Sequence, residues 1–387
     1  MLSVLARARK SIGRAALALA ALALAACQPT GGGGPTVSQG EAVPVALLVP
    51  GGSGQSSDDV LAQSLQNAAR LAAADLGGVK IDLRVYNTKG SPAEAQAMAT
   101  QAIAEGAVVI LGPVYAQEAN AVGAVAAASG VNVLSFSNNP AVAGGNVFVL
   151  GNTFLNTAQR LAGYAVRNGM PRIMVVSDQN AAGEAGKAAI TAAIPQAGGT
   201  VAGSASYEFS QNGIVQAAPT IAATAQSSAA NAIFLTAETA GALPLLTQLL
   251  RENGLAADQV RFLGLTRWDI PAEAVALPGV QGGYFALPDP ALYGQFQQRY
   301  QAAYGTAAHP IASLGYDGVA AIGALAKRGK GFSASALTQG SGFAGVTGIF
   351  RFLPDGTNQR GLAVAQIQNR QVVVVDAAPR SFGGFGF

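Results

Sequence analysis

The sequence has few of the side chains that most often carry chemistry. Its 387 residues include one cysteine, one histidine and one tryptophan, and only 11% of them are charged. A single cysteine cannot form a disulfide within the chain, and one histidine without free thiols does not make a zinc site. The sequence therefore predicts no disulfide framework, no metal site and no cofactor, so stability must come from packing.

Catalytic motifs are missing as well. A serine triad would have to use His309, but no Gly-x-Ser-x-Gly elbow accompanies it. His309 directly precedes Pro310 at the start of a helix, where a capping or loop role is the ordinary explanation. The loop at residues 51–54 follows a strand and precedes a helix, yet it lacks the Lys-Ser/Thr ending of a Walker loop. We therefore expect that the protein is not an enzyme.

The amino terminus has the layout of a secretory signal. Basic residues between Arg7 and Arg14 precede an Ala/Leu run from Ala15 to Ala26, which is too short to span a bilayer. The run ends in Leu-Ala-Ala-Cys, which resembles a bacterial lipobox. The resemblance implies that residues 1–26 are removed and that lipidated Cys27 attaches the protein to a membrane. By the sorting rule of such lipoproteins, Gln28 implies the periplasmic face of the outer membrane.

Removing this leader changes the charge balance. Residues 1–26 hold four of the 23 lysines and arginines and none of the 20 acidic residues, so the net charge falls from +3 to −1. The sequence pI near 9.0 therefore belongs to the precursor. A mature surface without net positive charge has no field that attracts nucleic acid, so we expect no nucleic-acid partner.

The body of the chain alternates strand and helix patterns. Residues 27–43 are a flexible, glycine-rich tether, and the 44–376 segment is longer than one core usually covers, so two lobes are expected. Apolar runs predict strands at 44–49, 79–86, 107–111, 131–136, 172–177, 200–207, 231–236, 261–265 and 280–287. The alternating pattern at 79–86 is typical of an edge strand. Helical periods lie between these strands, which predicts an α/β fold with mostly parallel sheets and ligands at their carboxyl ends.

Several segments together resemble a type I periplasmic binding protein, the fold of branched-chain amino-acid-binding proteins. The segments are 45–50, 111–113 with 133–135, 173–176, 316–318, and 345–348 followed by 352–356. The resemblance implies two Rossmann-like lobes joined by three crossovers, with a closing antiparallel hairpin. Lobe 1 is expected at 44–150 plus 279–340, lobe 2 at 151–278 plus 341–376, and a disordered tail at 377–387.

Two functions fit this resemblance. One is the solute-binding component of an ABC importer, which closes on an amino acid or a related small polar ligand and docks on an ABC permease. The candidate cleft residues are Ser53, Gly54, Tyr115, Ser135, Ser137, Asp178, Glu238 and Trp268. Three of them have an alternative role: Ser137 also suits a turn, Asp178 a helix cap, and Glu238 the first turn of a helix. Trp268 suits a cleft wall and core packing equally well.

The other function is that of the penicillin-binding-protein activators, outer-membrane lipoproteins with a similar fold that stimulate peptidoglycan synthases. The chain departs from the amino-acid-binding pattern, since it reads Gly112-Pro113-Val114-Tyr115 where the family usually places a hydroxyl shortly after Gly-Pro, and the aromatic residue expected after Asp178 is missing. The lipobox, Gln28 and this weakened pocket favour the activator, so a peptidoglycan synthase is the preferred partner. Against it, the helical-repeat domain of some activators is absent.

Overall fold

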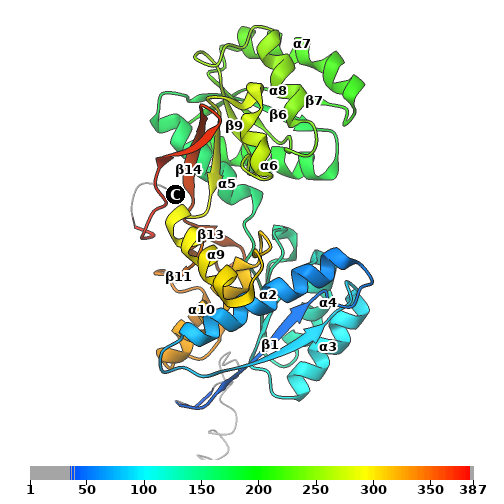
Figure 1. Ribbon diagram of the computed structural model, residues 1–387, viewed down its shortest axis with the longest axis vertical. Coiled ribbons are helices and arrows are strands. Elements are labelled where there is room, and N and C mark those ends of the chain that lie inside the picture. The colour runs from blue at the N-terminus through cyan, green and yellow to red at the C-terminus, as the bar shows by residue number, and fades with distance from the viewer. Residues whose placement is uncertain (1–34, 36, 39, 384–387) are drawn as a thin grey trace, which may run out of the picture. The chain divides into compact units, whose positions relative to one another are not determined.

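The computed structural model describes residues 35, 37–38 and 40–383. The expected signal peptide, Cys27 and most of the 27–43 tether lie outside the described residues. Within the described part, two α/β lobes each contain a mostly parallel sheet, and a small antiparallel sheet completes the fold (Figure 1). The predicted fold class is confirmed. No helix in this part of the chain is both long and apolar enough to cross a membrane.

Lobe 1 is built on a five-stranded parallel sheet, sheet A, with the order β2-β1-β3-β4-β5. Its strands are β1 (Val43–Val49), β2 (Ile81–Asn87), β3 (Val109–Leu111), β4 (Asn132–Ser135) and β5 (Val147–Val149), and its helices are α2 (Ser56–Asp75), α3 (Pro92–Ala104) and α4 (Ala116–Ala127). In β1, Leu47 packs in the core formed with α2, whereas Leu48 packs in the core formed with α3 and α4. This strand is apolar throughout because both of its faces are buried. The predicted edge strand is β2, which lies at one edge of sheet A.

Lobe 2 contains a seven-stranded sheet, sheet B, with the order β15-β14-β10-β9-β8-β6-β7. Its strands are β6 (Arg172–Asp178), β7 (Thr200–Tyr207), β8 (Ala232–Leu235), β9 (Arg261–Gly264), β10 (Tyr284–Leu287), β14 (Ala363–Gln368) and β15 (Gln371–Asp376). The helices are α5 (Phe154–Arg167), α6 (Ala181–Gln196), α7 (Gln211–Ser227) and α8 (Leu243–Glu252), with short 3-10 turns at Ala272–Ala276 and Pro278–Val280. Only β14 and β15 are antiparallel to their neighbours. Helices α5 and α6 cover one face, and α7 and α8 cover the other.

The lobe boundaries differ from the expected ones in two places. Strand β10 was assigned to lobe 1 as part of 279–340, but it pairs with β9 and β14 in sheet B. Its side chains alternate between the two cores of lobe 2, with Phe285 in one and Ala286 in the other. The chain therefore returns to lobe 1 only after β10. The helices that follow, α9 (Pro290–Tyr304) and α10 (Ser313–Lys327), pack against α2, where Tyr300 bonds to Ser64.

The second difference concerns the 341–376 segment, which was assigned entirely to lobe 2. After the short helix α11 (Ala334–Leu337), the strands β11 (Phe343–Gly345), β12 (Gly348–Phe352) and β13 (Asn358–Arg360) form the small sheet C. The rings of Phe343, Phe350 and Phe352 lie in the core of lobe 1, which holds this sheet there. Lobe 1 therefore comprises β1 to β5 and α9 to β13, whereas lobe 2 comprises α5 to β10 with β14 and β15.

The tail was expected to be disordered, but residues 377–383 pack against the body. Arg160 donates a hydrogen bond to the carbonyl of Ala377 at 3.1 Å, and Ala378 is buried. The guanidinium carbon of Arg351 lies 4.6 Å from the centre of the Phe382 ring. These contacts explain why residues 377–383 are ordered and not disordered as expected: the segment contacts Arg160 of lobe 2 and Arg351 of lobe 1. Residues 384–387 lie outside the described part.

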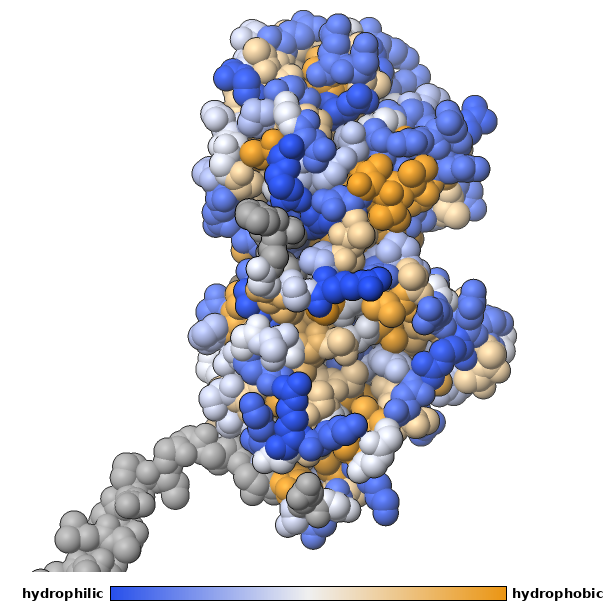
Figure 2. All heavy atoms as spheres, turned by 90° about the vertical axis from the view of Figure 1, so that its left-hand side faces the viewer, coloured by the Kyte–Doolittle hydropathy of each residue, from blue (hydrophilic) through white to orange (hydrophobic). Residues whose placement is uncertain are grey.

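The outer strand of sheet B carries exposed apolar side chains. Val372 to Val375 in β15 are each more than one third exposed, and β15 pairs only with β14 in the described sheet. Figure 2 faces the side on which β14 lies in Figure 1 and shows hydrophobic side chains gathered on this lobe. Such an edge, without charge or proline between Val372 and Val375, is open to pairing with another extended segment.

Candidate functional site

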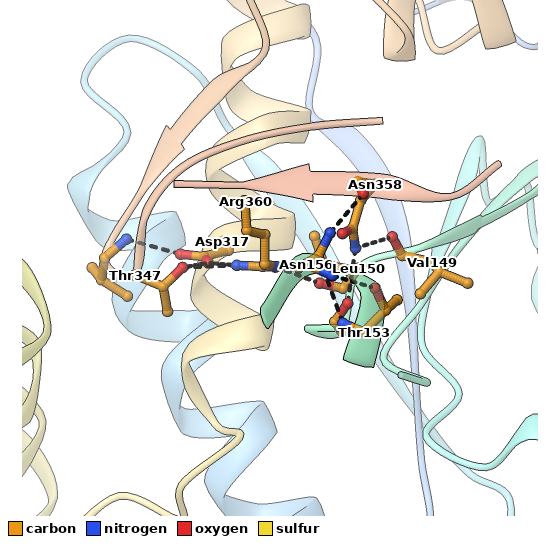
Figure 3. Close-up of polar contacts among 10 residues, drawn as sticks. Val149, Leu150, Thr153, Asn156, Asp317, Thr347, Asn358 and Arg360 are labelled. Carbon is orange, nitrogen blue, oxygen red and sulfur yellow. Dashed lines mark hydrogen bonds and ion pairs between the residues drawn. The ribbon is translucent and has the colours of Figure 1, made fainter. Parts of the chain in front are cut away.

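A buried polar network fixes the crossings between the lobes (Figure 3). Arg360, at the end of β13, donates from Nη1 to Asp317 at 3.3 Å and to Thr347 at 2.9 Å, and from Nε to the carbonyl of Leu150 at 3.0 Å. Asn358 donates to the carbonyl of Val149 at 2.7 Å. The first crossing, after β5, is thereby tied to the third crossing, after β13.

Asp317 is the centre of this network. It accepts a hydrogen bond from the backbone N–H of Val346 at 2.8 Å and another from the hydroxyl of Thr347. Gly345 lies so close that a Cβ atom there would overlap with the carboxylate of Asp317. Two segments that carry the family resemblance, 316–318 and 345–348, therefore meet in space. Sequence reasoning did not single out Arg360, although it closely follows the second segment.

A cavity of about 260 Å³ adjoins this network at the hinge between the lobes. Residues from all three crossings line it, together with the start of α10 and the loop after β9. Its apolar lining residues are Phe154, Leu265, Ile270, Ala286, Leu287, Pro288, Pro310, Ile311, Leu314 and Leu362, and its polar ones are Asn152, Thr157, Thr266, Arg267, Ser313, Thr347 and Arg360. We call it the hinge cavity.

A second, smaller pocket lies at the carboxyl ends of β6 and β8 in lobe 2. It brings together the two predicted cleft acids, Asp178 and Glu238, and we call it the acidic pocket. Its other lining residues are Phe154, Asn180, Ala182, Gly183, Phe209, Thr236 and Leu265. Because Phe154 and Leu265 line both spaces, the acidic pocket and the hinge cavity are neighbours.

The surroundings of Asp178 perturb its carboxyl group. Asp178 is 4% exposed, and its side chain accepts a hydrogen bond from the hydroxyl of Tyr207. Its backbone N–H donates to the hydroxyl of Thr236 at 3.1 Å. Burial, and then repulsion by Glu238, raise the pKa of Asp178 above its ordinary value. A positive charge in the acidic pocket favours the ionised carboxylates and therefore acts against this rise in pKa.

Two of the lobe 1 candidates come together with a residue that sequence reasoning missed. The exposed Tyr115 donates a hydrogen bond to Asp58, and Gly90 lies against Ser53, Asp58 and Tyr115. Burial and the carboxylate of Asp58 raise the pKa of Tyr115 to about 12. Gly54 has a φ of 84°, which favours glycine in this loop. Acidic residues in the first turn of a helix are common, so the sequence alone did not mark Asp58 as a partner of Tyr115.

The other lobe 1 candidates have internal partners. Ser135 is fully buried, donates to the carbonyl of Pro113 at 3.0 Å and accepts from the N–H of Ser137 at 3.1 Å. The hydroxyl of Ser137 accepts from the N–H of Asn139 at 3.1 Å, which is the turn role that the sequence left open. Neither residue lines the hinge cavity or the acidic pocket.

Trp268 belongs to the core of lobe 2, not to a cleft wall. Its side chain is fully buried, and its ring lies against Gly264 and Gly283, where a Cβ atom would overlap with the indole. Of the two roles that the sequence left open, packing is the one observed. His309 has its expected loop role, because its Nδ1 accepts a hydrogen bond from the N–H of Ile311 at 3.4 Å. The described residues contain no cluster of three potential metal ligands.

Two α/β lobes, three crossings and cavities at the hinge define the class of two-lobed binding folds. The chain belongs to the periplasmic binding protein family, whose sequence profile matches residues 42–371. Membership of this family indicates a periplasmic or other extracytoplasmic location. No curated protein matches the chain.

Solved structures show the same fold. A branched chain amino acid ABC transporter periplasmic ligand-binding protein from Burkholderia xenovorans LB400 is 18% identical, with 88% of this chain and 97% of that chain covered and a TM-score of 0.66. An ABC transporter substrate-binding protein from Desulfitobacterium hafniense in complex with Leu is 18% identical, with 87% and 100% covered and a TM-score of 0.63. A solute binding protein of an ABC transporter from Rhodopseudomonas palustris BisB5, in complex with 3,4-dihydroxy benzoic acid, is 17% identical, with 88% and 98% covered and a TM-score of 0.58.

Proposed function

We propose that this protein is the solute-binding component of an ABC importer and that it holds a small ligand between its lobes. The observation that carries the proposal is the hinge cavity, which residues of both lobes and all three crossings line. Small-molecule sites are concave, mostly apolar and often found at domain interfaces. The structural relatives described as ABC transporter binding proteins support this choice of the two functions considered.

The position of the cavity suits a protein that closes on its ligand. A molecule at this place touches Leu265 and Leu287 from lobe 2 as well as Ile311 and Leu314 from lobe 1. Such a ligand binds better when the lobes are closed, so it shifts the population toward the closed form. A permease can then distinguish the loaded protein from the empty one by its shape.

A thermal-shift screen of the purified protein with amino acids, amines, carboxylates and aromatic acids tests the proposal. A ligand at a hundred times its dissociation constant stabilises the folded protein by about 2.7 kcal/mol. Phe154→Ala should weaken every such shift, because Phe154 lines both the hinge cavity and the acidic pocket. Val60→Ala is the control, since Val60 is exposed and lines neither space. The proposal fails if no compound of the panel stabilises the protein.

The activator function and the lipid anchor stay predictions from the sequence. The anchor rests on the lipobox at Cys27, and the activator function rests on the lipobox, Gln28 and the departures from the amino-acid-binding pattern; Cys27 and Gln28 lie outside the described residues. Mass spectrometry of the mature amino terminus tests the anchor, because a diacylglyceryl group on Cys27 adds a defined mass. Capture of a bifunctional peptidoglycan synthase by the purified protein tests the activator function. An importer component should bind a small ligand and leave such a synthase uncaptured.

A further inference from the structure

The amino end of sheet A carries a group of basic side chains. Lys80 directly precedes β2, and Lys327, Arg328 and Lys330 lie at the end of α10 and just after it. All four residues are exposed. Lys80 and Lys327 line the same pocket, of about 210 Å³, so the two basic segments are neighbours in space although they lie far apart in the chain. We call these four residues the basic patch.

The charges of the basic patch are not compensated by acidic side chains. Its three lysines form no ion pair with any residue that the structure describes. Arg328 donates a hydrogen bond to the neutral side-chain oxygen of Gln339 at 2.9 Å. Glu41 is the only acidic residue among those that line the pocket. The patch therefore presents net positive charge, although the mature chain as a whole has a net charge of −1.

The segment that leads to the predicted lipid anchor joins the body at the same place. Val37 and Gly40, near the start of the described chain, line the pocket beside the basic patch. The sequence predicts a lipid on Cys27, which is ten residues before Val37. Ten residues span at most about 35 Å even when fully extended. A lipid at Cys27 therefore keeps the basic patch within this distance of a bilayer surface.

We propose that the basic patch docks lobe 1 on the anionic phosphate groups of a lipid bilayer. Each lysine or arginine close to an anionic membrane strengthens binding about fivefold, and the attraction falls off within about 10 Å at 0.1 M salt. The tether limits the distance of the body from the bilayer, and the patch determines which end faces it. Because the strands of sheet A are parallel, their carboxyl ends, which Ser53 and Tyr115 follow, point away from the bilayer. The docking is thus independent of the proposed ligand site.

Vesicle sedimentation tests the docking with a chain that begins at Gln28. This chain contains every described residue of both lobes but no lipidation site, so its binding does not depend on an acyl chain. In about 0.1 M salt, vesicles with about one third phosphatidylglycerol should bind it at least about tenfold more tightly than vesicles of phosphatidylcholine alone. Raising the salt to about 1 M, where the Debye length is about 3 Å, should remove this difference. Equal binding to both kinds of vesicle, or binding to neither, would overturn the proposal.

Two double variants with the same change of charge locate the contact. Lys80→Gln with Lys327→Gln removes two charges of the basic patch and should weaken binding to the anionic vesicles at least about tenfold. Lys89→Gln with Lys187→Gln is the matched control, because these lysines pair with acidic residues outside the patch, and it should change the binding less than about twofold. Circular dichroism checks that both variants fold. Equal losses in the two variants would mean that the vesicles respond to total charge, which contradicts docking through the patch.

Discussion

The buried pair of Asp317 and Arg360 makes a quantitative prediction about the hinge. The side chains are 0% and 4% exposed, and the nearest charged atoms lie 3.3 Å apart. Asp317→Asn keeps the volume of the side chain but leaves the guanidinium of Arg360 buried opposite a neutral group. Removing one member of a buried ion pair costs about 3–5 kcal/mol, because the remaining charge has lost both water and partner. Since the free energy of unfolding of a folded protein is about 5–15 kcal/mol, this cost is a large share of the total stability.

An exposed pair in the same chain provides the control. Lys89 and Glu94 lie 3.0 Å apart, but their side chains are 55% and 32% exposed. Glu94→Gln should therefore cost no more than about 1 kcal/mol. A double-mutant cycle of Asp317→Asn with Arg360→Met should show a coupling energy of at least about 1 kcal/mol, since the double variant no longer contains a buried unpaired charge.

Urea unfolding measures these values with two probes. Trp268 is the only tryptophan and lies in lobe 2, whereas Asp317 lies in lobe 1. Fluorescence therefore follows lobe 2, and circular dichroism follows both lobes. If the hinge network couples the lobes, Asp317→Asn lowers the urea midpoint of both signals together. The reasoning is refuted if Asp317→Asn costs no more than Glu94→Gln, or if the coupling energy is zero.

Three further predictions use the same measurements. Gly264→Ala should lower the free energy of unfolding by about 1–3 kcal/mol, because the new Cβ atom overlaps with the indole ring of Trp268. Gly294→Ala, in open space on α9, should instead raise the free energy of unfolding by about 0.5–1 kcal/mol. Equal stabilities of the two variants would contradict this prediction. Because burial and Glu238 raise the pKa of Asp178 in the folded protein, the free energy of unfolding should fall as the pH rises through the range in which Asp178 ionises; urea unfolding across pH should find this dependence weakened in Asp178→Asn, and an unchanged dependence would contradict it. Deleting residues 377–387 should destabilise the folded protein by about 1.5 kcal/mol more than deleting residues 384–387 alone, because the longer deletion removes the hydrogen bond from Arg160 to Ala377. Equal urea midpoints of the two deletion variants would instead support a disordered tail.

The strands and helices were predictable because their signals are local. The apolar run of β1 predicts a strand that is buried on both faces, and the alternating pattern of β2 predicts a strand at the edge of the sheet. The lobe of β10 was not predictable in this way. A short apolar strand fits either sheet equally well, and only its pairing with β9 and β14 decides. The same holds for sheet C, whose phenylalanines could have packed on either lobe.

The candidate site was predictable where a side chain follows a strand. Asp178 is the last residue of β6 and Glu238 follows β8, and these strands are neighbours in sheet B, so the meeting of the two acids in one pocket follows from the topology. Ser135 and Ser137 lie outside both pockets, and their hydroxyls bond to backbone groups close by in the structure, as hydroxyls next to turns often do. Trp268 lies in the core because two glycines, one in β9 and one just before β10, leave room for its ring.

The hinge network shows why a motif can be visible in the sequence while its role is not. Asp317 and Thr347 lie in segments that carry the family resemblance, yet each is an ordinary residue within its own segment. Their chemistry arises only when Arg360, 43 residues from Asp317, enters the space between them and reaches the carbonyl of Leu150. This cluster ties the end of β5 to sheet C and α10, and two of its members, Arg360 and Thr347, also line the hinge cavity. Under the proposed function, a ligand in the hinge cavity therefore contacts residues that hold the crossings. The proposed function thus predicts that ligand binding and lobe closure are coupled through direct contact, without any relay across the sheets.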